Sequence, residues 1–124
     1  MNWEQYNLIH KFIFPILHDV SYTQAKNVHP LKQRAIGKIV QNEDLASLCN
    51  ELILFGSAIS MKCHKNSDID LAINVKNDSI EKRNKISKIL YELTDYNVDL
   101  VWLNDSANDS SKIYKNIKNG VKLI

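Results

Sequence analysis

Three aspartates in this 124-residue chain have the spacing of a metal-binding cluster. Asp68 and Asp70 are two residues apart in a stretch that begins by alternating polar and apolar residues, so both would point to one face of a β-strand. Asp99 lies in a later strand-like stretch, and its neighbours Val98 and Leu100 would point the opposite way. If the two strands are adjacent, the three carboxylates meet, and without a counter-charge they raise one another's pKa values.

A hard divalent cation would relieve this repulsion. Carboxylate oxygens favour Mg²⁺ or Mn²⁺ over softer metals. A pair of such ions can hold both the attacking and the leaving oxygen of a phosphoryl or nucleotidyl transfer. The plain alternative is that the three aspartates are solvent-facing strand residues with no shared role.

A candidate phosphate-binding turn precedes the aspartates. The short apolar run Leu52–Phe55 predicts a buried strand, and it is followed at once by Gly56 and Ser57. Backbone N–H groups at such a turn bind phosphate when the turn leads into a short helix, and glycine permits a close approach. An ordinary tight turn is the alternative. The next loop carries three basic residues that either add charge to the site or are simply solvated: Lys62, His64 and Lys65.

The N-terminal third of the chain has helical patterns. Apolar spacing predicts a helix over residues 6–20, kinked or broken at Pro15 because proline has no N–H to donate. The polar stretch Ser21–His29 is expected to be a loop. A second helix should follow Pro30, and Asn42 should cap a third, shorter helix. The expected inner face of the second helix is Leu31, Ala35, Ile36, Ile39 and Val40.

The remainder predicts strands alternating with helices. Strands are expected at Leu52–Phe55, Asp68–Val75, Tyr96–Leu103 and, as a last edge strand, Val121–Ile124. Asn77 or Asp78 should cap a helix whose inner face is Ile86, Ile89, Leu90 and Leu93. A polar helix over Asp105–Lys118 should turn Ile113 and Ile117 inward, and Gly120 should end it in a left-handed conformation. This order predicts a small α/β or α+β domain.

Composition narrows the class of protein. The chain is 44% hydrophobic and 24% charged, which is the balance of one globular domain. Its longest apolar run, Phe12–Leu17, is far shorter than the roughly 20 residues that cross a bilayer, so no membrane partner is expected. No secretory signal is visible, and the two cysteines are expected to be reduced thiols in the cytoplasm. The net charge of +2 is too small to indicate nucleic acid binding.

The motif residues resemble a known family. Gly56-Ser57, then ten residues, then Asp68-Ile69-Asp70 reproduces the Gly-Ser-x10-Asp-x-Asp signature of the minimal nucleotidyltransferases of the DNA polymerase β superfamily. Ser67 fits the family's usual Ser-Asp-hydrophobic-Asp run, and Asp99 stands where the family has its third carboxylate. The resemblance implies a mixed sheet with helices mainly on one side over residues 30–124, with residues 1–29 as an extra helical extension.

The resemblance also implies a reaction. A nucleotidyl group, AMP from ATP or the equivalent from another nucleoside triphosphate, would pass to a hydroxyl with Mg²⁺ or Mn²⁺ as cofactor. Asp68 and Asp70 would hold both metal ions, while Asp99 would bind the ion nearer the acceptor and take its proton. The expected nucleotide contacts are Gly56, Ser57, Ser67 and Lys62. One departure is that many members have arginine at the positions that are Ala58 and Ser60 here.

The acceptor is left open by the sequence. A protein partner or a second copy of the chain is expected to help build the acceptor site. Within the family resembled, the leading role is an antitoxin-type partner of a small helical HEPN-like protein, whose tyrosine is adenylylated. The alternatives are a homodimeric enzyme acting on a small hydroxylated molecule, such as an aminoglycoside antibiotic, and a module that binds nucleotide or partner without turnover.

Overall fold

The structure is a computed structural model that describes residues 2–11, 17, 20–105 and 112–124. The helices in these ranges are α1 (Trp3–Ile9), α2 (Gln33–Val40), α3 (Glu43–Leu48), α4 (Ile80–Leu93) and α5 (Lys112–Lys118). The strands are β1 (Cys49–Phe55), β2 (Ile69–Val75), β3 (Val98–Trp102) and β4 (Val121–Lys122). The 3₁₀ turns are η1 (Ala25–Asn27), η2 (Pro30–Lys32), η3 (Gly56–Ile59) and η4 (Leu103–Asp105). Among the described helices, none has the length and apolar character needed to cross a bilayer.

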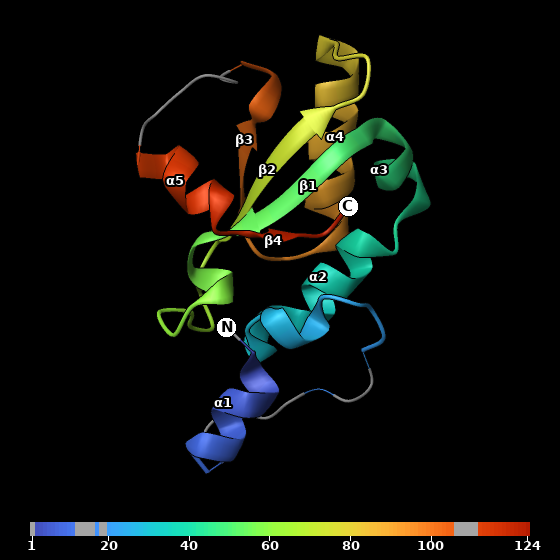
Figure 1. The fold of residues 1–124 in the computed structure, drawn as a ribbon. Helices are drawn as coiled ribbons and strands as arrows, with labels where there is room; N and C mark the ends of the chain where they lie inside the picture. The colour runs from blue at the N-terminus through green and yellow to red at the C-terminus, as the bar shows by residue number, and fades with distance from the viewer. Residues whose placement is uncertain (1, 12–16, 18–19, 106–111) are drawn as a thin grey trace.

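The strands form one mixed sheet in the order β3-β2-β1-β4 (Figure 1). β1 is antiparallel to both β2 and β4, whereas β2 and β3 are parallel. A parallel pair needs a crossover connection, and α4 provides it between β2 and β3. The predicted α/β class and the mixed sheet are therefore confirmed, with β4 as the expected edge strand.

The helices lie mainly on one face of this sheet. α2, α3 and α4 cover that face, and the main core cluster joins them to the sheet through residues such as Ile36, Leu45 and Ile86, all of which are fully buried. α5 lies on the opposite face, where Ile117 packs with Phe55 and Ala72 in a smaller cluster. The expected arrangement, with helices mainly on one side, is confirmed, and α5 is the exception (Figure 1).

The sequence predicts the N-terminal cap of α3 correctly and that of α4 wrongly. Asn42 caps α3 as predicted, because its side-chain oxygen accepts the Leu45 N–H at 2.8 Å. The helix after β2 is instead capped by Ser79, which accepts the Lys82 N–H. Asn77 adopts a left-handed conformation with φ of 50°, which delays the start of α4 until after Ser79. The Asp78 carboxylate pairs with Arg83.

Two predicted helices differ in extent. α1 ends at Ile9, and Lys11 then has a positive φ of 58°, so the predicted helix is shorter than expected. Ile9, one of the apolar residues whose spacing predicts this helix, is 76% exposed. The expected break at Pro15 lies outside the described residues. Asp105 belongs to the turn η4 and not to the following helix, because it is held by Arg83.

Three further predictions are wrong, two about side-chain burial and one about backbone conformation. Leu31 is 43% exposed because it lies in the tight turn η2, ahead of the amphipathic helix. Ile113 is 42% exposed, so only Ile117 of the predicted pair is buried in α5. Gly120 does not take a left-handed conformation. A Cβ there would lie only 2.6 Å from the Leu54 carbonyl oxygen, so glycine is needed for close approach to β1.

The N-terminal extension contacts the sheet domain. Trp3 of α1 is fully buried, and its ring lies edge-on to His29 with 4.6 Å between the ring centroids. The His29 backbone N–H in turn donates to the Ala58 carbonyl at 2.7 Å. The extension therefore packs on the turn that follows β1, while the expected domain boundary near residue 30 stays a prediction.

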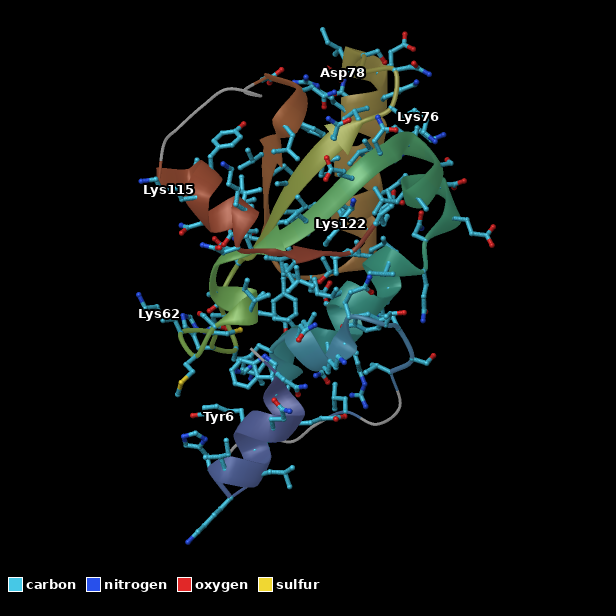
Figure 2. The ribbon with its side chains drawn as sticks, viewed as in Figure 1. Tyr6, Lys62, Lys76, Asp78, Lys115 and Lys122 are labelled. Atoms are coloured by element: carbon cyan, nitrogen blue, oxygen red, sulfur yellow. The ribbon has the colours of Figure 1, made fainter. Side chains whose placement is uncertain are left out.

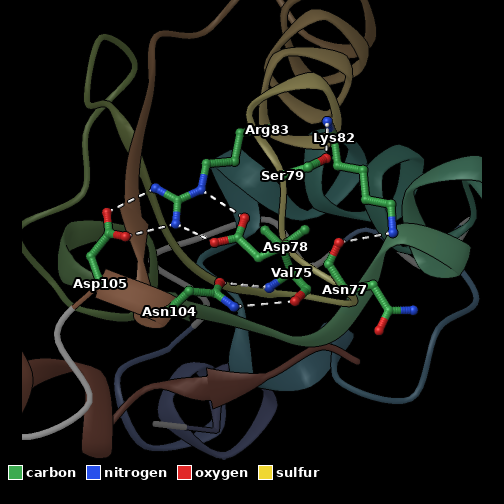
Figure 3. Close-up of polar contacts among 8 residues, drawn as sticks. All are labelled: Val75, Asn77, Asp78, Ser79, Lys82, Arg83, Asn104 and Asp105. Atoms are coloured by element: carbon green, nitrogen blue, oxygen red, sulfur yellow. Dashed lines mark hydrogen bonds and ion pairs between the residues drawn. The ribbon is translucent and has the colours of Figure 1, made fainter.

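A polar network closes the end of β2 that is remote from the aspartates (Figure 3). The Asn104 side chain accepts a hydrogen bond from the Val75 N–H at 2.8 Å and donates one to the Val75 carbonyl at 3.1 Å. Both backbone groups at the end of the strand therefore have hydrogen-bond partners. Beside it, Arg83 bonds to both Asp78 and Asp105.

Replacing Asn104 with alanine should lower the free energy of unfolding by about 1 kcal/mol, because two hydrogen bonds to Val75 are lost. Urea unfolding measures the change. Asn84→Ala, at an exposed position of α4, is the matched control and should be neutral or slightly stabilising because alanine favours helix. Equal stability of Asn104→Ala and wild type would contradict the assignment.

Candidate active site

Sheet register brings two of the predicted carboxylates together. In the parallel pair of β2 and β3, Asp70 lies directly opposite Asp99, so both side chains share one face. Asp68 stands one residue before β2, outside the sheet. All three line one shallow pocket of about 390 Å³, which Ser57 and Ser67 also line. The shared face inferred from strand parity is therefore found for Asp70 and Asp99, whereas Asp68, predicted to begin the strand, reaches the pocket from the loop before β2. The chemical roles of the three residues stay predictions.

Asp70 has the strongest electrostatic perturbation in this pocket. Its pKa is raised from 3.8 to about 6, most strongly by partial burial and then by the nearby carboxylates of Asp99 and Asp68. A hydrogen bond between the Asp70 and Asp99 side chains also contributes to the raised pKa. The pair thus holds a proton at a pH where an ordinary aspartate has lost it, which is the behaviour of like charges held together.

The donor set suits a hard cation. A carboxylate pair that repels in the absence of a counter-charge, with a third carboxylate on the same pocket, is the oxygen environment that Mg²⁺ or Mn²⁺ prefers. Across the described ranges, however, no three His, Cys, Asp or Glu side chains stand close enough to enclose an ion. Asp70 and Asp99 are fixed by the sheet, whereas Asp68 is placed by its loop. The three-ligand metal site stays a prediction.

The Gly-Ser turn follows the end of β1 directly. Gly56 opens η3 with φ of +75°, a conformation that favours glycine. A Cβ on Gly56 would lie 2.1 Å from Oδ2 of Asp70, so a side chain there would displace that carboxylate. The missing side chain lets the turn and the aspartate occupy the same corner of the pocket. Ser57 lines the pocket beside it.

Ala58 and Ser60 occupy the two positions at which many members of the resembled family have arginine. Ala58 is fully buried in the main core cluster, so a guanidinium at this position could not reach the pocket without leaving the core. The Ser60 hydroxyl donates to the Ser57 carbonyl at 3.3 Å and so stiffens the turn. Lys62 is exposed on the loop after η3 (Figure 2), and it is not among the residues that line the pocket. Its predicted contact with nucleotide therefore stays untested.

Two further pocket residues come from the same loop. His64 and Asn66 line the pocket, and the sequence singles out His64 only as one of three basic residues in this loop. The buried Ser67 hydroxyl accepts the His64 N–H at 2.9 Å, and the His64 ring nitrogen Nδ1 accepts the Asn66 N–H at 3.2 Å. These bonds order the loop ahead of Asp68. No sequence pattern marked Asn66, because the motif fixes only the length of this loop.

Lys32 is a buried cation that sequence analysis missed. Its side chain is fully buried, and Nζ donates to the carbonyls of Ser67 at 2.7 Å and Lys65 at 3.4 Å. Nζ also lies 3.3 Å from the centroid of the Tyr96 ring. Burial lowers the pKa of Lys32, while Cys63 and Asp68 act in the opposite direction. A lysine at the start of an amphipathic helix is usually solvated, so nothing in the local sequence indicated this position.

Comparison with known proteins identifies one family. The sequence model of the family described as "Polymerase beta, Nucleotidyltransferase" matches residues 35–124. The match includes the Gly-Ser turn and all three aspartates, and it begins after Lys32. The search of curated proteins found no significant match.

Gly56→Ala should destabilise the protein by about 1–3 kcal/mol, since alanine at positive φ is strained and its Cβ would collide with Asp70. Gly37→Ala in α2 is the control, because a Cβ there would lie 3.1 Å from the edge of the Tyr22 ring without backbone strain. Urea denaturation compares the two. A Gly56→Ala protein as stable as wild type would show that the turn does not need glycine.

Asp70→Asn should raise the melting temperature of the metal-free protein by a few degrees near pH 7.5. The folded-state pKa of about 6 exceeds the usual 3.8, so the ionised carboxyl destabilises the fold above pH 6. Wild type regains this stability as pH falls from about 6 towards 3.8, so the advantage of the variant should disappear there.

Melting scans between pH 4 and 8 test this dependence, with Glu92→Gln on the exposed side of α4 as the matched charge-neutralising control. A lower melting temperature for Asp70→Asn at pH 7.5 would mean that this carboxylate is needed for folding.

Proposed function

The chain belongs to the polymerase beta nucleotidyltransferase family, and on that premise we propose that its pocket moves a nucleotidyl group, AMP from ATP, to a hydroxyl acceptor. The observation that carries the proposal is the register that sets Asp70 opposite Asp99, beside the glycine turn. Repelling carboxylates next to a phosphate-binding turn suit a polyphosphate substrate that arrives with divalent cations.

Each element of the pocket has a distinct task in this proposal. The turn at Gly56 and Ser57 binds the outer phosphates through backbone N–H groups and the Ser57 hydroxyl. Asp68 and Asp70 would hold both Mg²⁺ or Mn²⁺ ions, and Asp99 would share the ion nearer the acceptor. When bound, these ions supply charge neutralisation for the attacking and leaving oxygens.

The transfer itself is an exchange of one oxygen–phosphorus bond for another. The acceptor hydroxyl oxygen forms a bond to the α-phosphorus, the bond to the pyrophosphate oxygen breaks, and pyrophosphate leaves with the electron pair. Asp99 is the exposed member of the three aspartates, and it takes the proton of the hydroxyl. Most of the rate enhancement would come from positioning and from charge stabilisation.

The acceptor is proposed to arrive on a protein. The pocket is shallow, and carboxylates and loop groups line it; among the residues that the structure describes, no apolar wall encloses a small molecule there. A hydroxyl presented by a partner or by a second copy of this chain brings its own surroundings. The resemblance to minimal nucleotidyltransferases favours a tyrosine of a HEPN-like partner, with this chain as the antitoxin-type member of the pair.

One observation favours a second candidate, a module that binds nucleotide without turnover. Ala58 is buried and Ser60 bonds within the turn, so neither position supplies a cation to the triphosphate. A weakly held nucleotide would then serve as a ligand and not as a substrate. The complete set of aspartates argues for the enzyme.

Labelled ATP distinguishes these functions. With Mg²⁺ and a lysate of the source cells, label from the α-phosphate should appear on an acceptor, while label from the γ-phosphate should be released in pyrophosphate. EDTA should abolish transfer, and Asp99→Asn should reduce it at least about a hundredfold, because a general base contributes 10²–10⁴-fold. Glu92→Gln is the control with unchanged transfer.

The species that carries the label decides the acceptor. Label on a protein band supports the partner role, and label on a small molecule supports the antibiotic-type alternative. Binding of Mg-ATP without any transfer supports the non-catalytic module. Transfer of the γ-label would overturn nucleotidyl transfer and would indicate a kinase-type reaction.

A further inference from the structure

Lys32 lies where the segment before the family match meets the loop before β2. The match begins at Ala35, so Lys32 comes from the part of the chain that precedes it. Its side chain is nevertheless fully buried beneath the pocket loop. A buried ammonium group is costly unless hydrogen bonds or charges compensate it. What compensates Lys32 therefore indicates what the residue does.

The first compensation comes from the backbone next to Asp68. Lys32 Nζ donates to the Ser67 carbonyl at 2.7 Å, and this carbonyl belongs to the peptide bond that joins Ser67 to Asp68. A second, longer bond reaches the Lys65 carbonyl at 3.4 Å. The two bonds fix the orientation of the peptide from which the Asp68 side chain extends. Asp68 needs such a support because it stands outside the strand ladder that fixes Asp70 and Asp99.

The second compensation comes from the segment before β3. Nζ lies 3.3 Å from the centroid of the Tyr96 ring, within the range of a cation–π contact. The Tyr96 hydroxyl donates to the Leu31 carbonyl at 3.4 Å, which ties the ring to the residue before Lys32. The backbone carbonyl of the next residue, Asn97, accepts a hydrogen bond from the Ile69 N–H at 2.9 Å. Lys32 therefore joins the two segments that enter β2 and β3, on which the carboxylates lie.

The same segment also supports the glycine turn. The His29 N–H donates to the Ala58 carbonyl at 2.7 Å, inside η3. Two residues of one short segment thus contact both halves of the pocket: His29 holds the turn after Gly56, and Lys32 holds the loop before Asp68. The charge of Lys32 has no described ion-pair partner within 4 Å, so its main polar contacts are these carbonyls and the ring.

We propose that Lys32 is a positioning residue for the active site: its ammonium group holds the Ser67–Asp68 peptide and so presents the Asp68 carboxylate to the pocket. Lys32 does not touch substrate, because it is fully buried. The inference rests on the proposed function only in taking Asp68 as a metal ligand. Under this proposal, the segment before residue 35 helps to position a residue of the active site.

The test compares Lys32→Met, which keeps length and apolar contacts but removes the charge, with Lys38→Met, an exposed lysine of α2. Amide hydrogen exchange over residues 62–69 of the metal-free protein reports the order of the loop. Titration with Mn²⁺, followed by electron paramagnetic resonance, reports binding at the aspartates. Lys32→Met should speed exchange in this loop and weaken Mn²⁺ binding about 10–100-fold, as loss of a group that orients a ligand does.

Steady-state kinetics separate positioning from a general loss of structure. In Lys32→Met we expect kcat to fall while KM for ATP changes little, because the Gly56 turn is held separately by His29. If Lys32→Met does not fold, Tyr96→Leu removes the supporting ring and should give the same changes in smaller degree. Tyr96→Phe keeps the ring and loses only the long hydroxyl bond to the Leu31 carbonyl, so its effects should be smaller than those of Tyr96→Leu.

The outcomes are distinct. Wild-type loop exchange and Mn²⁺ affinity in a folded Lys32→Met protein would overturn the proposal, and so would equal effects in Lys38→Met. Faster loop exchange with unchanged Mn²⁺ affinity would also overturn it, because Asp68 would then be placed without Lys32. If wild type itself binds no Mn²⁺, the proposed function fails, and loop exchange alone decides whether Lys32 positions Asp68.

Discussion

The pairing of β2 with β3 is the constraint on which the pocket depends. Their parallel register sets Asp70 opposite Asp99, and the hydrogen bonds of the sheet keep these carboxylates together even though they repel. The crossover through α4 makes a parallel register possible, and the apolar residues that bury α4 against the sheet hold it in place. The folding energy of the domain is thus what maintains an unfavourable electrostatic arrangement at one end of the sheet.

Crowding at this end of the sheet explains the residue types around it. Gly56 has no Cβ because Asp70 occupies that space, and its positive φ turns the chain sharply after β1. Ala58, two residues later, is small and buried because η3 packs on the core at that point. The turn η3 therefore brings no cationic side chain to the pocket, which separates this chain from the arginine-containing members that it resembles.

The segment before the family match is part of the same structure. Trp3 packs on His29, His29 bonds to the glycine turn, and Lys32 bonds to the loop ahead of Asp68. A family description that starts at residue 35 omits these contacts, although they reach both sides of the pocket. Such a support is also a place where the N-terminal part of the chain can influence the site without touching a substrate.

The sequence by itself determined the strands that carry Asp70 and Asp99, the face that these two aspartates share and the glycine turn, because each follows from a local period or a fixed spacing. It also determined the Asn42 cap, which depends on neighbouring residues only. It did not determine that Ala58 is buried, that Ser79 and not Asn77 caps α4, or that Gly120 is needed for approach to β1. Above all, it could not show that Lys32 lies beneath the pocket loop against Tyr96. These features depend on contacts between segments distant in the chain, and such contacts exist only once the sheet and its helices have packed together.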